Sequence, residues 1–449
     1  MTSLAKSSRS ARKTAVELLE RICKNGEYSN EIIPNTLQKS DLSQQDKSLV
    51  LELVNGTLRW QGHLDWILKQ YFHGNFEKSP DMLKRILEVS LYQIRFLDKV
   101  PEYAAVSEGV KIAKEAGGQP WGKLVNGVLR NYQRSCNSIK FPAVDSDPVS
   151  AISVEHSHPE WLVQRWLGRY GLENTIQFCE HNNRRPEISL RTNLRRTTPA
   201  ALLTEFEKSG IQAKPSKYFD DFIKISHPGD LTELPSFQNG LFAIQDESTA
   251  LATQLLALEE GDTVLDMCAA PGGKTCHIGQ LVGDEGKVIA VDIKTNRLNL
   301  LKENAARLGL KSIQALLGDA SKIDLPKIDK ILLDAPCSGL GVLSKRADLR
   351  WKRKPQDIFN VRKIQKRILE NAARLLKRGG TLVYSTCTLE PEENEKLIEE
   401  FLKRHSKFQV DRDSDSVHRT FSTPEGYWTS VPYEHKMDGV FAVKLINSN

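Results

Sequence analysis

Two cysteines in the second half of the chain follow apolar runs that are typical of buried strands. Cys337 follows the run in LLDAPCSGLG, and Cys387 follows the run in VYSTCTLEPEEN. Because neighbouring parallel strands end at the same edge of a sheet, we expect the two thiols to lie close together. One cysteine at a strand end is more often a packing residue. Two together, with Asp334 and Pro336 beside them, indicate nucleophilic chemistry.

Methylation at C5 of a cytosine is a reaction that needs such groups. C5 is a poor nucleophile until a thiolate adds to C6, and this addition pushes negative charge onto N3 and O2. Asp334, at the end of the apolar run before Cys337, is expected to hydrogen-bond at N3 and to stabilise that charge. A cytosine in folded RNA must first be unstacked to reach such a pocket. The residues alone leave open which cysteine attacks.

The loop DMCAAPGGKT, residues 266–275, also follows an apolar run, and its last four residues are typical of a phosphate-binding loop. That loop requires the pattern GxxxxGK[ST], in which the first glycine allows a tight turn around the phosphates. Cys268 stands at this position, and Pro271 removes a backbone N–H that would bind phosphate. A nucleotide triphosphatase is therefore the weaker of two alternatives for this loop.

Two acidic residues favour a nucleoside without phosphates. Asp292 ends the next apolar run, where a carboxylate can accept hydrogen bonds from ribose hydroxyls, and Asp319 follows the third run, where an adenine amino group would lie. The loop also lacks the GxGxxG pattern of sites that bind a pyrophosphate. A nucleoside with a small charged tail fits better, and the predicted cofactor is S-adenosylmethionine.

The elements that must position these residues change along the chain. Apolar residues at helical spacing from residue 11 to about 135 predict an all-α domain, and short strands alternating with helices predict a small α/β module after it. From about residue 240, buried strands alternate with helices, which predicts a mostly parallel, doubly wound sheet. The predicted boundaries are 1–140 for the helical domain, 141–157 for a linker, 158–237 for the module and 238–449 for the catalytic domain.

Composition limits the class of protein. The 449 residues have a formal net charge of +6, which permits nucleic-acid binding without requiring it. The seven cysteines show no CxxC pair or zinc-finger spacing, so we expect free thiols in a reducing cytoplasm and no metal. No apolar run is long enough for a membrane helix, and the first residues lack the apolar segment of a secretory signal. The default expectation is a cytoplasmic monomer.

Two basic segments are candidates for holding RNA. Residues Lys345 to Lys354 contain six basic groups and one acid, with Trp351 among them. Cations can follow phosphates, and an aromatic ring can stack on a base, although a solvated helix start has the same composition. The second segment, NNRRPEISLRTNLRR in the middle module, is as easily explained by arginines on strand edges.

Three of these motifs resemble the signature motifs of the Nop2/Sun family of RNA (cytosine-5) methyltransferases: DMCAAPGGKT, DAPCSGLGVL and YSTCTLEPEEN. The helical N-terminal region, with VNGTLRW and LVNGVLRN, resembles the RNA-binding NusB domain. This resemblance implies a C-terminal Rossmann-like class I methyltransferase domain. It also implies S-adenosylmethionine as cofactor and 5-methylcytidine in 16S ribosomal RNA as product. The alternative from another class is a non-catalytic RNA-binding assembly factor on a methyltransferase fold.

The resemblance also implies roles for individual residues. In this family the cysteine of the TC motif, here Cys387, forms the covalent adduct with C6, and the cysteine of the PC motif, here Cys337, assists release of the product. DNA cytosine methyltransferases use the PC cysteine as nucleophile instead. The cofactor contacts that carry over are Cys268, Ala269, Ala270, Pro271, Gly272, Gly273, Lys274, Asp292, Asp319 and Asp334.

Overall fold

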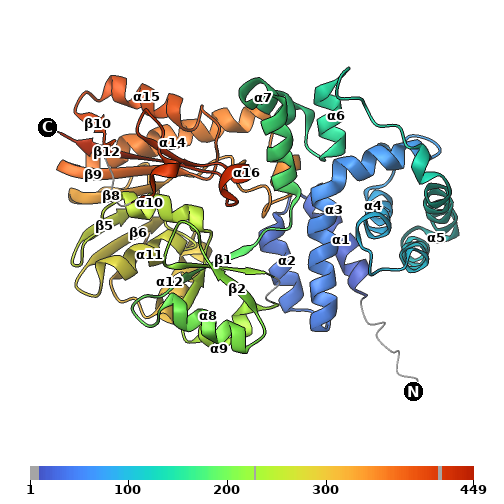
Figure 1. Ribbon diagram of the computed structural model, residues 1–449, viewed down its shortest axis with the longest axis horizontal. Coiled ribbons are helices and arrows are strands. Elements are labelled where there is room, and N and C mark those ends of the chain that lie inside the picture. The colour runs from blue at the N-terminus through green and yellow to red at the C-terminus, as the bar shows by residue number, and fades with distance from the viewer. Residues whose placement is uncertain (1–9, 227–228, 413–416, 449) are drawn as a thin grey trace. The chain divides into compact units, whose positions relative to one another are not determined.

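The computed structural model describes residues 10–226, 229–412 and 417–448, and Figure 1 shows the course of the chain. The chain divides into two compact units. The helical unit contains Met1–Arg184 and Leu343–Lys352, and the sheet unit contains Arg185–Val342 and Arg353–Asn449. The N-terminal residues on which the expectation of a missing secretory signal partly rests lie outside the described residues.

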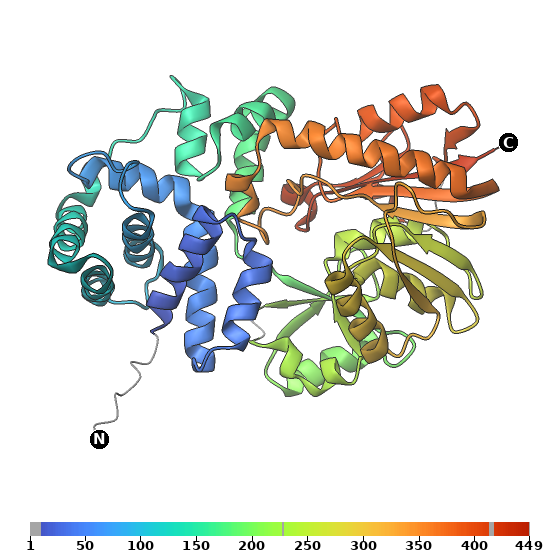
Figure 2. The same ribbon diagram turned by 180° about the vertical axis from the view of Figure 1, so that it is seen from behind.

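The helical unit forms because apolar side chains recur on one face of each long helix. In α1, Ala15, Leu19 and Ile22 are buried, and Ser10 caps the helix by accepting a hydrogen bond from the N–H of Lys13. Such faces meet in one apolar core, and Figure 2 shows the helices around it from behind. The helices are α1 (Ala11–Lys24), α2 (Ser29–Gln38), α3 (Gln44–Tyr71), α4 (Asp81–Phe96), α5 (Glu102–Ser135), α6 (Pro148–Glu155) and α7 (Glu160–Asn183), with α13 (Leu349–Lys352) in the later segment.

Two details of the helical unit differ from the simplest expectation. Helix α5 continues through Gly117 and Gly118 but bends there, because Gly118 has a φ of +75°, a conformation that other residues rarely adopt. The stretch expected to be a linker contains α6. The side chain of Asp147 caps this helix by accepting a hydrogen bond from the N–H of Ser150, and a proline occupies its first turn.

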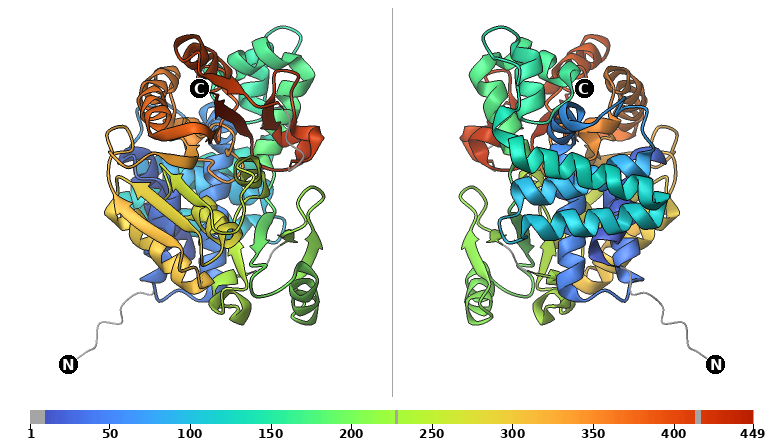
Figure 3. Two further views of the ribbon diagram at one scale, coloured as in Figure 1. Left: turned by 90° about the vertical axis from the view of Figure 1, so that its left-hand side faces the viewer. Right: turned by 90° about the vertical axis from the view of Figure 1, so that its right-hand side faces the viewer.

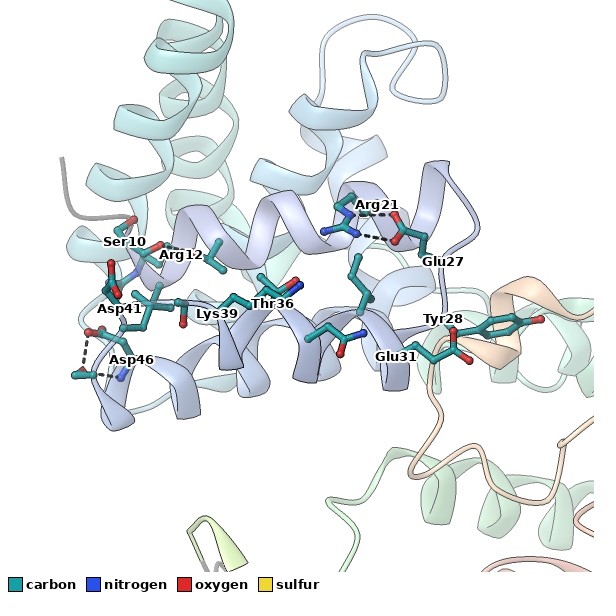
Figure 4. Close-up of a pocket in the computed structure, with 17 residues that line it drawn as sticks. Ser10, Arg12, Arg21, Glu27, Tyr28, Glu31, Thr36, Lys39, Asp41 and Asp46 are labelled. Carbon is teal, nitrogen blue, oxygen red and sulfur yellow. Dashed lines mark hydrogen bonds and ion pairs between the residues drawn. The ribbon is translucent and has the colours of Figure 1, made fainter. Parts of the chain in front are cut away.

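A pocket of about 1470 Å³ in the helical unit is lined by α1, α2 and the start of α3 (Figure 4). Charges of both signs line it, and Arg21 faces Glu27 across a two-fold hydrogen bond of 2.9 and 2.7 Å. Because acids neutralise the neighbouring bases, the pocket does not offer the single-signed surface that phosphates require. Its basic residues are Arg12, Arg21 and Lys39, and its acids are Glu27, Glu31, Asp41 and Asp46.

The sheet unit begins with a small antiparallel sheet in the strand order β2-β3-β1-β4. Its strands are amphipathic, and Leu190, Ile223 and Phe242 bury one face against α8 and α9. The elements are β1 (Ile188–Thr192), α8 (Pro199–Lys208), β2 (Gln212–Pro215), β3 (Phe222–Ser226), α9 (Pro235–Gln238) and β4 (Phe242–Ile244). This agrees with the predicted small α/β module.

The main sheet has the strand order β10-β12-β9-β8-β5-β6-β7, with β11 paired to β12. The strands from β9 to β7 in this order are mutually parallel, as predicted. The strands β10, β11 and β12 add an antiparallel edge that the sequence reading did not anticipate. The strands are β5 (Thr263–Asp266), β6 (Lys287–Asp292), β7 (Ile313–Leu317), β8 (Ile328–Asp334), β9 (Leu376–Thr386), β10 (Phe408–Val410), β11 (Tyr427–Ser430) and β12 (Val440–Asn447).

Helices cover both faces of the main sheet, which is why its central strands are mostly apolar. In β8, Leu332 packs with α10 and α11, whereas Ile331 and Leu333 pack with α14 and α15. The left view of Figure 3 shows strands of the main sheet with helices beside them. The helices are α10 (Ala250–Leu255), α11 (Gly273–Val282), α12 (Thr295–Leu308), α14 (Pro355–Leu375), α15 (Glu395–Arg404) and α16 (Pro432–His435). Because β5, β6, β8 and β9 are parallel, their carboxyl ends meet at one edge.

Candidate active site at the carboxyl ends of the parallel strands

The thiols of Cys337 and Cys387 lie together at this edge, with their Sγ atoms 2.9 Å apart. Strands β8 and β9 pair with Asp334 opposite Ser385, so the loops that follow them leave the sheet side by side. Both cysteines are half-buried. The hydrogen bond with Cys387, burial, and the charges of Cys387 and Glu393 raise the pKa of Cys337 well above its ordinary value. The raised pKa favours the neutral thiol of Cys337.

Asp334 is fixed beside the cysteines by contacts to both carboxylate oxygens. Its Oδ1 accepts a hydrogen bond of 2.9 Å from the hydroxyl of Ser385, and its Oδ2 pairs with Nζ of Lys274 at 2.8 Å. Burial opposes the charge on Lys274, but the Asp334 carboxylate outweighs it and raises the pKa of the lysine. The side chain of Asp334 keeps 31% of its surface exposed, so it can also reach a substrate.

The loop after β5 turns sharply at Gly272 before α11 begins at Gly273. Gly272 has a φ of +108°, and a Cβ atom there would come within 3.0 Å of the side chain of Leu301. The hydroxyl of Thr275 ties the loop back by donating to Asp266 Oδ2 and to the carbonyl oxygen of Ala269, at 2.7 and 3.0 Å. This position therefore requires glycine for both its backbone angle and its close packing.

Asp292 lies at the end of β6 and is nearly enclosed, with 6% of its surface exposed. Its carboxylate accepts hydrogen bonds from the N–H groups of Ala270 and Lys294, at 3.2 and 3.0 Å. Asp319, after β7, accepts from the hydroxyl and the N–H of Ser321, and these bonds lower its pKa. The two acids lie at neighbouring strand ends, and Asp292 also shapes the glycine loop.

The donor set around this loop fits an adenosyl sulfonium better than a polyphosphate. Lys274, the lysine that a phosphate-binding loop would use, is already paired with Asp334. The acids at the ends of β6, β7 and β8 would repel phosphates, whereas they can accept hydrogen bonds from ribose and adenine and attract a positive tail. The geometry therefore disfavours the nucleotide triphosphatase alternative.

Sequence reasoning missed several polar residues beneath the cysteines. Glu393 and Gln365 lie inside the sheet unit and contact the Cys337 loop, and Asn394 contacts the Cys387 loop. The signal was present in the segment EPEEN, which follows Cys387 in the motif. Charged and amide residues after a strand usually lie in solvent, so the pattern alone did not single them out.

Two residues of the candidate RNA-binding segment Lys345–Lys354, Arg350 and Trp351, are engaged inside the helical unit. Arg350 is 0% exposed. Its guanidinium donates to three carbonyl oxygens and one amide oxygen of the helical unit, and Trp351 Nε1 donates to the carbonyl oxygen of Leu58 at 2.7 Å. Both side chains bond within the helical unit, and Arg350 is too buried to neutralise RNA phosphates. The acceptors of Arg350 are Arg59 O, Ser157 O, Asn182 O and Asn183 Oδ1, at 2.8 to 3.1 Å.

The second basic segment is also largely engaged within its own unit. Arg191 is 0% exposed and donates to Gln245 at 2.8 Å. Arg196 donates to the carbonyl oxygens of Asn239 and Arg307, at 2.6 and 2.9 Å. Arg191 is therefore a buried residue of the interior strand β1, and Arg196 is an exposed residue held by backbone carbonyls, so neither is the strand-edge arginine of that explanation.

Among the described residues, no group of three His, Cys, Asp or Glu side chains is arranged to hold a metal ion. In the same part of the chain, no helix has the length and apolar character needed to cross a membrane.

Family models match three consecutive parts of the chain. Residues 9–134 match the NusB family, and residues 158–232 match a ferredoxin-like domain described as RsmF/B-like. Residues 253–446 match a model described as 16S rRNA methyltransferase RsmB/F.

Relatives match over nearly the full length. The chain is 39% identical to the probable ribosomal RNA small subunit methyltransferase B of Bacillus subtilis (strain 168), over 90% of both chains. It is 33% identical to the ribosomal RNA small subunit methyltransferase B of Yersinia pestis bv. Antiqua (strain Angola), over 98% of this chain and 99% of the other.

Solved structures agree with these matches. The protein PH0851 aligns over 99% of both chains with a TM-score of 0.81 and 27% identity. NSun6 from Pyrococcus horikoshii, solved with the S-adenosylmethionine analogue SFG, has a TM-score of 0.59 and 26% identity over 65% of this chain and 98% of its own.

Proposed function

Because the chain belongs to the ribosomal RNA small subunit methyltransferase B family, it is a ribosomal RNA methyltransferase, and we propose that it methylates C5 of one cytosine in 16S ribosomal RNA. The observation that carries the proposal is the pair of thiols 2.9 Å apart beside Asp334. A methyl transfer to oxygen or nitrogen would need no cysteine nucleophile. Two cysteines beside a carboxyl group fit the methylation of a carbon atom that must first be activated.

S-adenosylmethionine is the proposed cofactor, and when bound it would supply the methyl group that its sulfonium sulfur carries. The residues proposed to hold it are the loop Cys268–Lys274 and the acids Asp292, Asp319 and Asp334. Their positions at the ends of neighbouring parallel strands support this assignment, because nucleosides bind at this edge of doubly wound sheets.

Cys387 is the proposed nucleophile. Its thiolate forms a bond to C6 of the cytosine, and the electron pair of the C5–C6 double bond becomes available at C5, which takes the methyl group. In this step Asp334 acts in its protonated form: its O–H donates a hydrogen bond to N3 and so stabilises the negative charge that develops on the ring. A base then removes the proton from C5, the double bond re-forms, and the S–C6 bond breaks so that Cys387 leaves as a thiolate. Cys337 lies beside this sulfur and is proposed to assist the breakdown.

We further propose that residues 1–140 and 158–237 form domains that bind the RNA around the target base, with 141–157 joining them and 238–449 as the catalytic domain. The match of residues 9–134 to the NusB family supports the first assignment. Binding that weakens steeply with salt would support phosphate contacts by these domains.

A single assay tests the proposed function. Purified protein is incubated with methyl-labelled S-adenosylmethionine and 16S ribosomal RNA, and bisulfite sequencing locates any methylated cytosine. Wild type and Cys136→Ser, a change in the helical unit, should both transfer methyl to C5, whereas Cys387→Ala should not. Methyl transfer by Cys387→Ala would show that Cys387 is not the nucleophile. Thermal stabilisation by S-adenosylmethionine without turnover would instead favour a non-catalytic assembly factor.

A further inference from the structure

A buried carboxyl group lies beneath the loop that carries Cys337. Glu393 is 0% exposed, and its Oε2 accepts hydrogen bonds from the N–H of Ser338 and from the amide of Gln365, both at 2.9 Å. The same Gln365 amide also donates to the carbonyl oxygen of Pro336 at 2.9 Å. Glu393 and Gln365 thus hold the residues on both sides of Cys337. Burial raises the pKa of Glu393, although the bonds from Ser338 and Gln365 oppose this.

The next residue in the chain does the same for the other cysteine. Asn394 is 0% exposed, and its Oδ1 accepts a hydrogen bond of 2.7 Å from the hydroxyl of Thr386. Its Nδ2 donates to the carbonyl oxygen of Thr388 at 2.9 Å. These two threonines flank Cys387, so the amide of Asn394 spans the residue that carries the proposed nucleophile.

Further bonds join the two loops to each other and to this pair. The hydroxyl of Ser338 donates to the hydroxyl of Thr388 at 3.0 Å, and the N–H of Gly341 donates to the carbonyl oxygen of Cys387 at 3.1 Å. The hydroxyl of Tyr384 donates to the backbone carbonyl of Glu393 at 2.6 Å, which anchors the pair to β9. The consecutive residues Glu393 and Asn394 therefore tie together the two loops that carry the thiols.

We propose that Glu393 and Asn394 are positioning residues: Asn394 fixes the loop of the attacking Cys387, and Glu393 fixes the loop of Cys337 and keeps Cys337 a neutral thiol while Cys387 reacts. The role of Cys387 as the attacking thiol in this inference rests on the proposed function. The proposed difference in ease of ionisation between Cys337 and Cys387 does not depend on the substrate.

The physical reason is repulsion between like charges in a partly desolvated site. Two sulfur atoms 2.9 Å apart cannot both carry a negative charge without a large penalty, so only one ionises readily. The Glu393 carboxylate, which accepts a hydrogen bond from the N–H of Ser338, adds its charge to the cost of a Cys337 thiolate and so favours ionisation of Cys387. Cys337 then remains a hydrogen-bond donor to the Cys387 sulfur. Breakdown of the adduct between Cys387 and C6 needs a group beside Cys387, and the Cys337 sulfur already lies there.

The first test measures thiol ionisation in the full-length protein without RNA. Iodoacetamide alkylates thiolates, and mass spectrometry of peptides follows Cys337 and Cys387 separately against pH. Glu393→Gln should lower the midpoint for Cys337 by about one pH unit. The control Glu392→Gln removes the same charge one residue away, from a side chain that pairs with Lys396, and should leave the midpoint unchanged. Glu393→Asp keeps the charge and should restore a high midpoint.

The second test needs no variant of Glu393, so it remains decisive if Glu393→Gln does not fold. Amide hydrogen exchange on the wild-type protein should show the N–H of Ser338 protected as strongly as those of the central strands. Exchange of this N–H at the rate of an exposed loop would overturn the inference. A folded Glu393→Gln protein with the wild-type alkylation profile of Cys337 would overturn it as well.

The third test addresses Asn394 through catalysis. Asn394→Ala should lower kcat for methyl transfer about tenfold or more while KM for S-adenosylmethionine is unchanged, because the cofactor loop is not touched. Asn394→Asp still accepts from Thr386 but cannot donate to Thr388, so it should recover part of the rate. Wild-type kcat in Asn394→Ala would remove Asn394 from the proposal. If the alkylation and exchange results hold but no cytosine is methylated, the proposed function fails and the inequality of the thiols stands.

Discussion

The ammonium group of Lys274 lies 2.8 Å from the carboxylate of Asp334, so an ion pair joins the glycine loop after β5 to the end of β8. Lys274→Met removes the cation and leaves Asp334 bonded to Ser385 alone. We expect kcat/KM for methyl transfer to fall by about 10²-fold, because the carboxyl group that should meet the cytosine loses its fixed position. Steady-state assays with labelled cofactor and 16S ribosomal RNA measure this change.

Lys274→Arg is the matched control for that prediction. It keeps the positive charge beside Asp334 and should retain more activity than Lys274→Met. Thermal unfolding of both variants separates loss of the site from loss of the fold. Equal activity of wild type and a folded Lys274→Met protein would show that the ion pair does not position the carboxyl group.

Cys337 gives a prediction that depends on the order of bond formation. Cys337→Ala should still form the S–C6 bond through Cys387 but release the methylated RNA slowly. A covalent protein–RNA complex should therefore accumulate and migrate as a shifted band on a denaturing gel. The double variant Cys337→Ala with Cys387→Ala should show no band, because the bonding sulfur is gone. A shifted band in the double variant, or none in the single variant, contradicts the assigned roles.

The sequence predicted the layers of the sheet unit because strand and helix periodicities are local properties. It also placed Cys337, Cys387 and Asp334 at strand ends, and parallel topology brings strand ends together. The antiparallel edge was missed even though β12, VFAVKLIN, is strongly apolar, because its pairing with β9 is not local. Such an edge on an otherwise parallel sheet is common.

The burial of Arg350 and Glu393 was not predicted, for a different reason. A charged side chain is almost always placed in solvent, and its burial depends on partners that lie far away in sequence. Arg350 finds acceptors near residues 59, 157 and 182, and Glu393 finds donors at residues 338 and 365. No local sequence pattern predicts these long-range hydrogen bonds.

Arg350 provides a prediction for the helical unit. Burial, followed by the charge of Arg59, lowers the pKa of this guanidinium to about 9, so the side chain is still charged at neutral pH. Arg350→Met would leave its buried acceptors without donors, and we expect a loss of roughly 3–5 kcal/mol in stability. Urea unfolding followed by circular dichroism measures the loss.

Arg350→Lys separates packing from RNA binding. A lysine supplies fewer donors than the five of an arginine, so this variant should be intermediate in stability. Because the side chain lies inside, RNA affinity of the folded Arg350→Lys protein should stay within about twofold of wild type, with an unchanged salt dependence. A clear drop in that salt dependence would return Arg350 to the RNA-binding surface.

Asp266 predicts how the stability of the sheet unit depends on pH. Its side chain is 1% exposed, and burial, followed by the charge of Asp334, raises its pKa to about 7, although the hydrogen bond from Thr275 opposes this. In the unfolded chain an aspartate has a pKa of about 3.9, so between about pH 4 and pH 7 the folded protein binds the extra proton. Stability contributed by the neutral carboxyl group is fully present below about pH 4 and is lost as the pH rises through 7. The loss is on the order of 4 kcal/mol.

Asp266→Asn removes this titration but keeps an oxygen that can accept the hydrogen bond from Thr275. Other groups titrate in both proteins, so the informative quantity is the difference in Tm between wild type and variant. The Tm of wild type should fall relative to the Tm of the variant as the pH is raised from about 4 to 8. A difference that does not change with pH would show that Asp266 ionises normally in the folded protein. The carboxyl group at the foot of the glycine loop would then be charged at neutral pH, and it would compete with Asp334 for Lys274.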